Sequence, residues 1–278
     1  MEKRRLGKTG VEIPALILGG GKHGVTKMDT RTAIEFLHRA LDLGLNYIDT
    51  ATAYGNGGSE LKIGEVLKTR RSEVFLATKL DQRTKAGAKQ ELKDSMARLQ
   101  TDRVDLIQLH AVIDEATLEQ ILAPDGAYAA VQEAKKAGLI RFIGITGHKD
   151  PKVLRRAIEM AEFDTVLVPV GCLETAYGED FISVLLPETE RQGIGVLGMK
   201  ALGHGLLEKS PLAPQMIRYA LNQPIAGEVI AMNSIQQLES NLALINPFIP
   251  LPEGEQRNLV EHVRPLATPQ NLFWRSVG

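Results

Sequence analysis

The sequence has a single cysteine, no long apolar run and no excess of either charge. Because Cys172 stands alone, one chain cannot build a disulfide framework, a structural zinc site or an iron–sulfur cluster. With 33 basic and 34 acidic side chains, the formal net charge of −1 gives no sign of nucleic-acid binding or of a polybasic membrane patch. No apolar stretch reaches the length of a membrane span, and the N-terminal residues lack the apolar core of a signal peptide. We therefore expect a cytoplasmic protein without nucleic-acid or membrane partners.

The length and composition of the chain suit one large globular unit. Its 278 residues are 44% hydrophobic and 24% charged, so a sizeable core can be buried. This is also a common length for one α/β barrel. No linker-like stretch interrupts the chain, and we expect a single domain over residues 1–278.

A short run rich in Val, Ile and Leu alternates with an amphipathic stretch through most of the chain. The apolar runs are Ala15–Leu18, Leu45–Ile48, Val74–Ala77, Val104–Leu109, Phe142–Ile145, Thr165–Val170, Gly195–Met199 and Val229–Met232. The stretches with helical spacing are Arg31–Leu43, Glu60–Leu67, Gly87–Leu99, Ala127–Ala137, Pro151–Ala161, Phe181–Gln192, Ala213–Leu221 and Ile235–Ile245. Near-continuous apolar strands joined by helix-length connections are typical of a parallel sheet covered on both faces. Eight such units predict a closed (β/α)8 TIM barrel of the α/β class.

An open, doubly wound sheet is the structural alternative. It is disfavoured because Gly19-Gly20-Gly21 follow the first run, where a dinucleotide-binding sheet would carry G-x-G-x-x-G. The ends of the chain lie outside the repeat. Residues 1–14 predict a short capping hairpin over the barrel bottom. A Pro-rich C-terminal tail follows Asn241, with one more helix expected near Gln256–Val263.

Polar residues stand where several of the expected strands end, which is where barrel enzymes place their active sites. Hydride reduction of a carbonyl leaves an alkoxide that needs a proton, and Tyr54 is placed to supply it. An ammonium at Lys79 would lower the pKa of the tyrosine, and Asp49 would hold that ammonium in place. His110 can donate to the substrate oxygen and orient it. This chemistry requires no metal.

The sequence around these positions resembles the aldo-keto reductases from Arg5 to about Asn241. The motifs that carry the resemblance are LGKTGV at 6–11, GLNYIDTATAYG at 44–55 and DLIQLH at 105–110. They are similar to bacterial and archaeal-type members, without the cysteine-rich C-terminal extension of some relatives. The resemblance implies a (β/α)8 barrel that interconverts aldehydes or ketones and alcohols by nicotinamide-dependent hydride transfer. It also implies a catalytic set of Asp49, Tyr54, Lys79 and His110.

The resemblance further implies a nicotinamide cofactor across the barrel mouth, with NADP(H) favoured over NAD(H). The residues expected to contact it are Gly20, Gly21, Thr146, Gly147, His148, Met199, Lys200, Ala201, Leu202, Gly203, Gly205, Met232, Asn233, Ser234, Gln237 and Asn241. Family members that favour NADP commonly carry basic residues near Asn233 and Gln237, so recognition of the 2′-phosphate would fall to Lys200. The amide side chain that often follows the sixth strand is replaced here by Gly171 or Cys172.

Two other functions remain open from the residues alone. Lys79 could form a Schiff base in a lyase. Alternatively, the protein could be a nucleotide-binding redox sensor with slow turnover. If the protein is a reductase, its substrate is a small carbonyl compound. The segment Ala111–Asp125 and the C-terminal tail are expected to shape its pocket, and the apolar wall is expected from Val112, Ile113, Tyr177 and Trp274.

Overall fold

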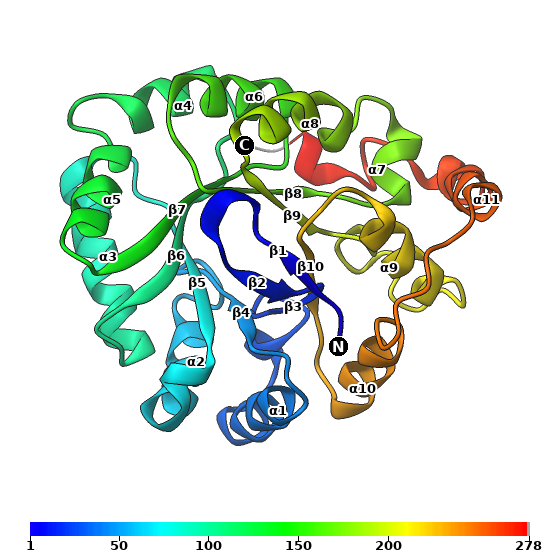
Figure 1. Cartoon of the computed structure of the whole chain (residues 1–278), viewed down its shortest axis with the longest axis horizontal. Coiled ribbons are helices and arrows are strands. Elements are labelled where there is room, and N and C mark those ends of the chain that lie inside the picture. Colours follow the sequence, from blue (N-terminus) through cyan, green and yellow to red (C-terminus); the bar gives the residue numbers. More distant parts are fainter. Residues whose placement is uncertain (277–278) are drawn as a thin grey trace.

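The computed structural model describes residues 1–276 and has a closed barrel of eight parallel strands at its centre (Figure 1). The strands run around the barrel in the order β10-β3-β4-β5-β6-β7-β8-β9. Their bounds are β3 Leu16–Gly19, β4 Tyr47–Asp49, β5 Phe75–Leu80, β6 Val104–Leu109, β7 Ile140–Thr146, β8 Thr165–Pro169, β9 Gly195–Met199 and β10 Gly227–Ala231. The prediction of a (β/α)8 barrel is confirmed, and the open sheet is wrong because β10 pairs with both β3 and β9.

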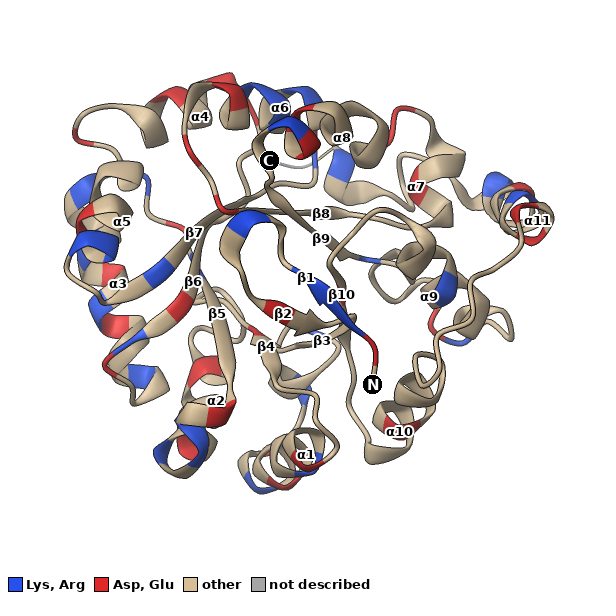
Figure 2. Ribbon diagram, viewed as in Figure 1, with Lys and Arg blue, Asp and Glu red and all other residues tan. Residues whose placement is uncertain are grey.

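Helices surround the barrel and connect its strands. Their bounds are α1 Thr30–Asp42, α2 Gly58–Arg70, α3 Lys85–Leu99, α4 Glu115–Leu122, α5 Ala127–Lys136, α6 Pro151–Met160, α7 Cys172–Tyr177, α8 Phe181–Gln192, α9 Ala213–Asn222, α10 Ile235–Ala243 and α11 Glu253–Val263. Several begin at a side chain that accepts a hydrogen bond from the first turn, as Asp29 does for α1, Asp180 for α8 and Ser234 for α10. Many of the Lys, Arg, Asp and Glu residues lie in these outer helices (Figure 2).

Two short helices were not expected from the sequence. Helix α4 lies inside the segment that we assigned to a pocket-forming loop. Asp114 caps it by accepting from the backbone N–H of Thr117, a start signal that the sequence does contain. Helix α7 follows β8 directly and has no side-chain cap. Its six residues are too few to show a helical period, so the sequence pattern could not predict this helix.

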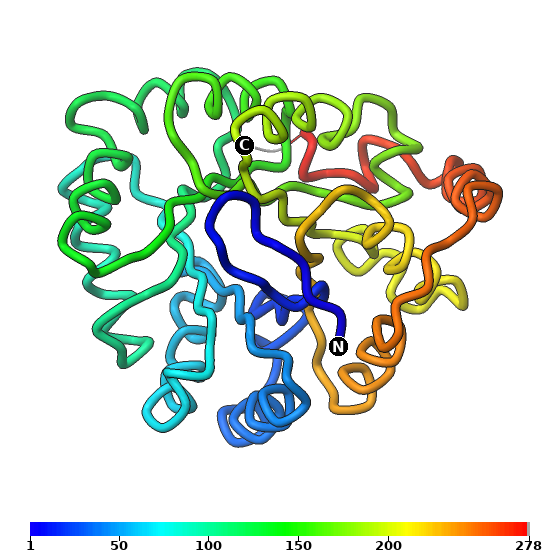
Figure 3. The backbone as a smooth tube through the Cα atoms, in the orientation of Figure 1, coloured from blue at the N-terminus to red at the C-terminus, as the bar shows by residue number. Residues whose placement is uncertain are grey.

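The N-terminal hairpin closes one end of the barrel. Strands β1 (Lys3–Arg5) and β2 (Glu12–Pro14) pair antiparallel, and Figure 3 shows this hairpin crossing the barrel. Leu6 and Ile13 are fully buried and belong to the same apolar cluster as Ile17, Tyr47 and Leu106 of the barrel interior. The strand N-termini are therefore sealed, and the opposite face is left for a binding site.

The C-terminal segment packs against residues that follow two of the barrel strands. The indole Nε1–H of Trp274 donates to Glu174 of α7 at 2.7 Å, and Arg275 Nε lies 3.1 Å from the same carboxylate. The Trp274 carbonyl accepts a hydrogen bond from His148 Nδ1, just beyond β7, at 2.9 Å. Trp274 is only 2% exposed. The tail is thus a fixed part of this face of the barrel.

Replacing Glu174 by Ala should loosen this segment. The variant leaves the buried Trp274 N–H and the Arg275 guanidinium without their carboxylate, which should cost about 2 kcal/mol of unfolding free energy. Trp274 is the only tryptophan of the chain, so its fluorescence emission reports on this segment alone. We expect that emission to shift to longer wavelength.

Glu188→Ala is the matched control, because Glu188 is also a buried glutamate paired with an arginine, Arg191 of α8. It should lower stability without shifting the emission. An unchanged emission spectrum in Glu174→Ala would show that Glu174 does not hold the segment.

No helix within residues 1–276 is both long and apolar enough to cross a membrane.

Candidate active site

The four residues expected to act in catalysis come from three neighbouring strands and one loop. Asp49 ends β4, Lys79 lies near the end of β5, and His110 directly follows β6. Tyr54 lies in the loop between β4 and α2. Because β4, β5 and β6 are adjacent and parallel, their carboxyl ends meet on one face of the barrel.

Lys79 and Asp49 form a buried ion pair inside the barrel. Each side chain is 1% exposed, and Lys79 Nζ contacts Asp49 Oδ1. The ammonium also donates to the Thr50 carbonyl at 2.8 Å, while Gln108 Nε2 donates to the second carboxylate oxygen of Asp49 at 2.9 Å. Burial lowers the pKa of Lys79, but Asp49 and Tyr54, through their charges and hydrogen bonds, together outweigh it and leave that pKa above its ordinary value. Lys79 is therefore held as an ammonium.

Tyr54 lies against this ammonium. Its hydroxyl oxygen is 3.4 Å from Lys79 Nζ, which is also 4.9 Å from the centre of the ring. Burial raises the pKa of Tyr54 and outweighs the lowering by Lys79, so the net shift is upward. The lowering by Lys79 that we expected is present, but the sequence does not show the burial that outweighs it. The hydroxyl keeps its proton at neutral pH, and Lys79 can stabilise the anion left when that proton is transferred.

His110 faces Tyr54 on one side and Asp81 on the other. Its ring meets the Tyr54 ring edge-on with centroids 6.3 Å apart. Its Nδ1 lies 2.8 Å from Asp81 Oδ1. Burial lowers the pKa of His110 despite the neighbouring Asp81 carboxylate, which favours the neutral imidazole. Asp81 was not among the residues that the sequence singled out.

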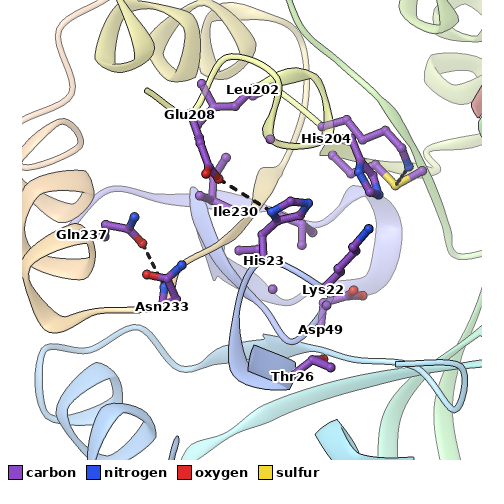
Figure 4. Close-up of a pocket in the computed structure, with 18 of the residues that line it drawn as sticks. Lys22, His23, Thr26, Asp49, Leu202, His204, Glu208, Ile230, Asn233 and Gln237 are labelled. Atoms are coloured by element: carbon purple, nitrogen blue, oxygen red, sulfur yellow. Dashed lines mark hydrogen bonds and ion pairs between the residues drawn. The ribbon is translucent and has the colours of Figure 1, made fainter. Parts of the chain in front are cut away.

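A cavity of about 500 Å³ opens beside Tyr54 and extends along the strand ends to α10 (Figure 4). Eleven of the expected site residues line it, and they are Gly21, Asp49, Tyr54, Met199, Lys200, Ala201, Leu202, Gly205, Asn233, Gln237 and Asn241. The cavity thus joins the Tyr54 hydroxyl to the loops after β9 and β10. Its volume is in the range of small-molecule and cofactor sites.

Within residues 1–276, the other expected residues do not line this cavity. These are Gly20, Lys79, His110, Thr146, Gly147, His148, Gly203, Met232 and Ser234. Several have a structural reason for their identity. A Cβ on Gly20 would lie 2.7 Å from Ser59 Oγ, and one on Gly147 would lie 2.6 Å from the Val112 carbonyl oxygen. Ser234 caps α10 by accepting from the Gln237 N–H.

The cavity also has polar residues that the sequence did not single out. Lys22, His23 and Thr26 come from the loop after β3, and Glu208 comes from the loop after β9. Figure 4 shows His23 and Glu208 facing each other, with His23 Nδ1 3.7 Å from Glu208 Oε2. Only closure of the barrel between β10 and β3 brings these loops together, so local sequence patterns could not pair them.

The loop after β9 turns sharply along one wall of the cavity. Lys200, Gly203, His204 and Gly205 all have left-handed backbone conformations, and glycine adopts them without strain. Burial lowers the pKa of Lys200 to about 8. Its Nζ lies 5.8 Å from the centre of the Trp274 ring, next to the C-terminal segment. This loop therefore presents a cation and a compact backbone to the cavity.

The expected apolar wall does not form at this cavity. Val112 and Trp274 are buried in the protein interior, whereas Ile113 and Tyr177 line a separate cavity of about 520 Å³. The charged residue Lys149 also lines that second cavity, so its lining is not apolar.

The chain is similar to known proteins in both sequence and fold. The model of the aldo/keto reductase family matches residues 15–215. The chain is similar to the uncharacterized oxidoreductase YqkF of Bacillus subtilis (strain 168), with 27% identity over 95% of this chain and 97% of the relative. It is also similar to the L-galactose dehydrogenase of Arabidopsis thaliana, with 28% identity over 99% and 98% of the two chains. Its fold is similar to the holo form of aldo-keto reductase AKR11C1 from Bacillus halodurans, with a TM-score of 0.79 and 26% identity over 95% and 96% of the two chains.

Proposed function

This chain belongs to the aldo/keto reductase family, and from that premise we propose that it reduces small aldehydes or ketones with NADP(H), using Tyr54 as the proton donor. The observation that carries the proposal is the Tyr54 hydroxyl, 3.4 Å from the buried Lys79 ammonium, on a residue that lines the cavity. We also propose that the chain is a single domain and works in the cytoplasm.

The residues that line the cavity suit a dinucleotide. A Cβ on Gly21 would lie 3.4 Å from the Tyr54 ring, so glycine here keeps the approach to the phenol open. Lys200 would pair with a phosphate, supported by the glycines of the same loop. Asn233, Gln237 and Asn241 would border the adenosine end. The cofactor would supply a hydride to the carbonyl carbon.

The protein side of the reaction is then a proton transfer. Tyr54 gives its hydroxyl proton to the carbonyl oxygen as the alcohol forms. Lys79 stabilises the resulting phenolate, and Asp49 holds Lys79 in place through the buried ion pair. Because the pair is preformed, the site does not reorganise as charge develops. His110, whose ring meets the Tyr54 ring edge-on, would orient the substrate.

The two alternative functions lose support. A Schiff-base lyase needs a neutral lysine, whereas Asp49 and Tyr54 together keep Lys79 protonated. A sensor with slow turnover would not require an ion pair aimed at a tyrosine hydroxyl. The reductase uses all of these groups in one step.

Titration with NADPH tests the proposal and the part that we assign to Lys200. Binding should quench the fluorescence of Trp274, the only tryptophan, whose ring lies next to Lys200. The Lys200 ammonium loses its proton as the pH rises through about 8, so its attraction for a phosphate weakens above that pH. We expect NADPH affinity to fall about tenfold between pH 7 and pH 9.

Lys200→Arg keeps the positive charge over this range and should bind NADPH with a nearly flat pH profile. Lys200→Ala should bind weakly at both pH values. A wild-type protein that binds neither NADPH nor NADH would end the proposal. Tight NADPH binding without any pH dependence would show that Lys200 does not bind the phosphate.

A further inference from the structure

The loop that carries Tyr54 is a single hydrogen-bonded unit. The Gly57 N–H donates to the Thr52 carbonyl at 2.8 Å, and the Ser59 N–H donates to the Tyr54 carbonyl at 3.2 Å. The loop then enters α2, whose first turn contains the fully buried Glu60. A bond made at Thr52 or at Glu60 therefore acts on the segment that holds the Tyr54 ring.

Glu60 bonds the beginning of α2 to two neighbouring elements. Its Oε1 accepts from Thr78 Oγ1 at 2.6 Å, and Thr78 directly precedes Lys79 in β5. Its Oε2 accepts from Arg98 Nε of α3 at 2.7 Å. The Arg98 side chain also covers the end of the loop, because a Cβ on Gly57 would lie 2.6 Å from Arg98 Cδ. Glu60 thus links the strand of Lys79 to the guanidinium of Arg98.

A second line of hydrogen bonds runs from Arg98 to the backbone of Lys79. Arg98 Nη2 donates to Ser95 Oγ at 3.2 Å, and Ser95 Oγ lies 3.0 Å from Thr52 Oγ1. Thr52 Oγ1 donates to the Lys79 carbonyl at 3.3 Å. Because a hydroxyl has one proton, Thr52 gives its own to the carbonyl and accepts the proton of Ser95. Ser95 is fully buried, so water does not compete for its bonds.

The two lines of bonds meet at the Arg98 guanidinium, whose planar fork directs two nitrogens to two different acceptors. Within residues 1–276, Arg98 does not line the cavity beside Tyr54, so it can act on the reaction only through other residues. We propose that Arg98 is a positioning residue for the proton transfer. It holds the loop of Tyr54 against the strand of Lys79 and so sets the 3.4 Å separation between the hydroxyl and the ammonium.

This inference rests on the proposed reductase function and adds a residue to it. The Tyr54 O–H bond breaks as its proton reaches the carbonyl oxygen, and the Lys79 ammonium stabilises the phenolate that is left. That stabilisation weakens as the two charges move apart. A displaced loop should therefore slow the chemical step while the cofactor still binds.

Arg98→Lys tests the junction while keeping its charge. Lysine can still pair with Glu60, but it lacks the second nitrogen that bonds to Ser95. We expect the single-turnover rate of NADPH oxidation with propionaldehyde to fall about tenfold, because a small displacement of a reacting group is costly. NADPH affinity, measured by quenching of Trp274 fluorescence, should stay within about twofold of the wild-type value.

Thr52→Val and Thr52→Ser isolate the line of bonds that leads to Lys79. Valine has nearly the volume of threonine but no hydroxyl, so the bond to the Lys79 carbonyl is lost and the single-turnover rate should fall. Serine keeps the hydroxyl, and Thr52→Ser should recover most of the wild-type rate.

Arg71→Lys is the matched control. Arg71 pairs with the buried Asp105 at 2.8 Å, and this carboxylate is also bonded to β5, through the Leu76 N–H at the end of the strand opposite to Lys79. Arg71→Lys should therefore disturb a similar ion pair on the same strand and leave the single-turnover rate unchanged.

Carbon-13 NMR tests the separation of the two groups without cofactor or substrate. The chain has five tyrosines, and Tyr54→Phe identifies the Cζ signal of Tyr54. Of the charges that act on this phenol, Lys79 lowers its pKa, whereas Asp49 and Asp81 raise it. With Lys79 farther from the hydroxyl, we expect the pKa of Tyr54 to be higher in both slow variants than in the wild type.

A wild-type single-turnover rate in Arg98→Lys, an unchanged pKa of Tyr54, or an equal loss of rate in Arg71→Lys would overturn the inference. If Arg98→Lys failed to fold, equal rates in Thr52→Val and Thr52→Ser would overturn it instead. A wild-type protein without NADPH-dependent reduction would contradict the proposed function. The NMR comparison would then still decide whether Arg98 holds Tyr54 next to Lys79.

Discussion

The Tyr54→Phe variant should lose about a thousandfold in kcat while binding NADPH as tightly as the wild type. The substitution removes one oxygen and its proton from the end of the cavity and keeps the ring that lines it. No other proton donor contacts Lys79 Nζ among the hydrogen bonds of residues 1–276, so no neighbour can replace the hydroxyl in its place beside the ammonium. The loss should appear in the chemical step and not in cofactor affinity.

Single-turnover oxidation of NADPH by an excess of enzyme measures that step, and Trp274 quenching measures the affinity. Tyr128→Phe is the matched control, because the Tyr128 hydroxyl donates to the Glu162 carbonyl on the outside of the barrel. It should leave both quantities unchanged. If Tyr54→Phe reduced carbonyls at more than about a tenth of the wild-type rate, another group would have to be the acid.

The barrel and the placement of its strand-end residues could be predicted because both follow from short-range patterns. Each apolar run marks a strand, and the first polar residues after it must lie on one face once the strands are parallel. Asp49, Lys79 and His110 are brought to that face by this rule alone. Tyr54 adds a motif match, and the structure then shows its hydroxyl next to Lys79.

The residues that support this set could not be predicted, because their identity is ordinary in sequence. Gln108 lies within an apolar run, and only the barrel interior shows that its amide bonds to Asp49. Asp81 follows a strand as many turn residues do, and its contact with His110 depends on the pairing of β5 with β6. The direction of the Tyr54 pKa shift depends on burial, which a list of neighbouring charges does not contain.

The Asp49–Lys79 pair connects the stability of the barrel to its chemistry. Two charges buried at 1% exposure lose nearly all of their hydration. Their mutual attraction compensates for that loss, together with the bond that Lys79 donates to the Thr50 carbonyl and the bond that Asp49 accepts from Gln108. An apolar pair of similar size would fill the same space without this loss. We infer that the charges are present for the tyrosine that they serve and not for the stability of the fold.

The Asp49→Ala variant should therefore be strongly destabilised, by about 3 to 5 kcal/mol, because it leaves the Lys79 ammonium buried and unpaired. Urea unfolding followed by circular dichroism measures this loss. The Asp49→Leu, Lys79→Met double variant removes both charges and fills the volume of the two side chains. It should therefore recover most of the stability lost in Asp49→Ala. Carbonyl reduction should remain absent in the double variant, because the Tyr54 phenolate has lost its cation. If the double variant were as unstable as Asp49→Ala, the pair would be required for folding itself. If it were active, Lys79 would have no part in the proton transfer.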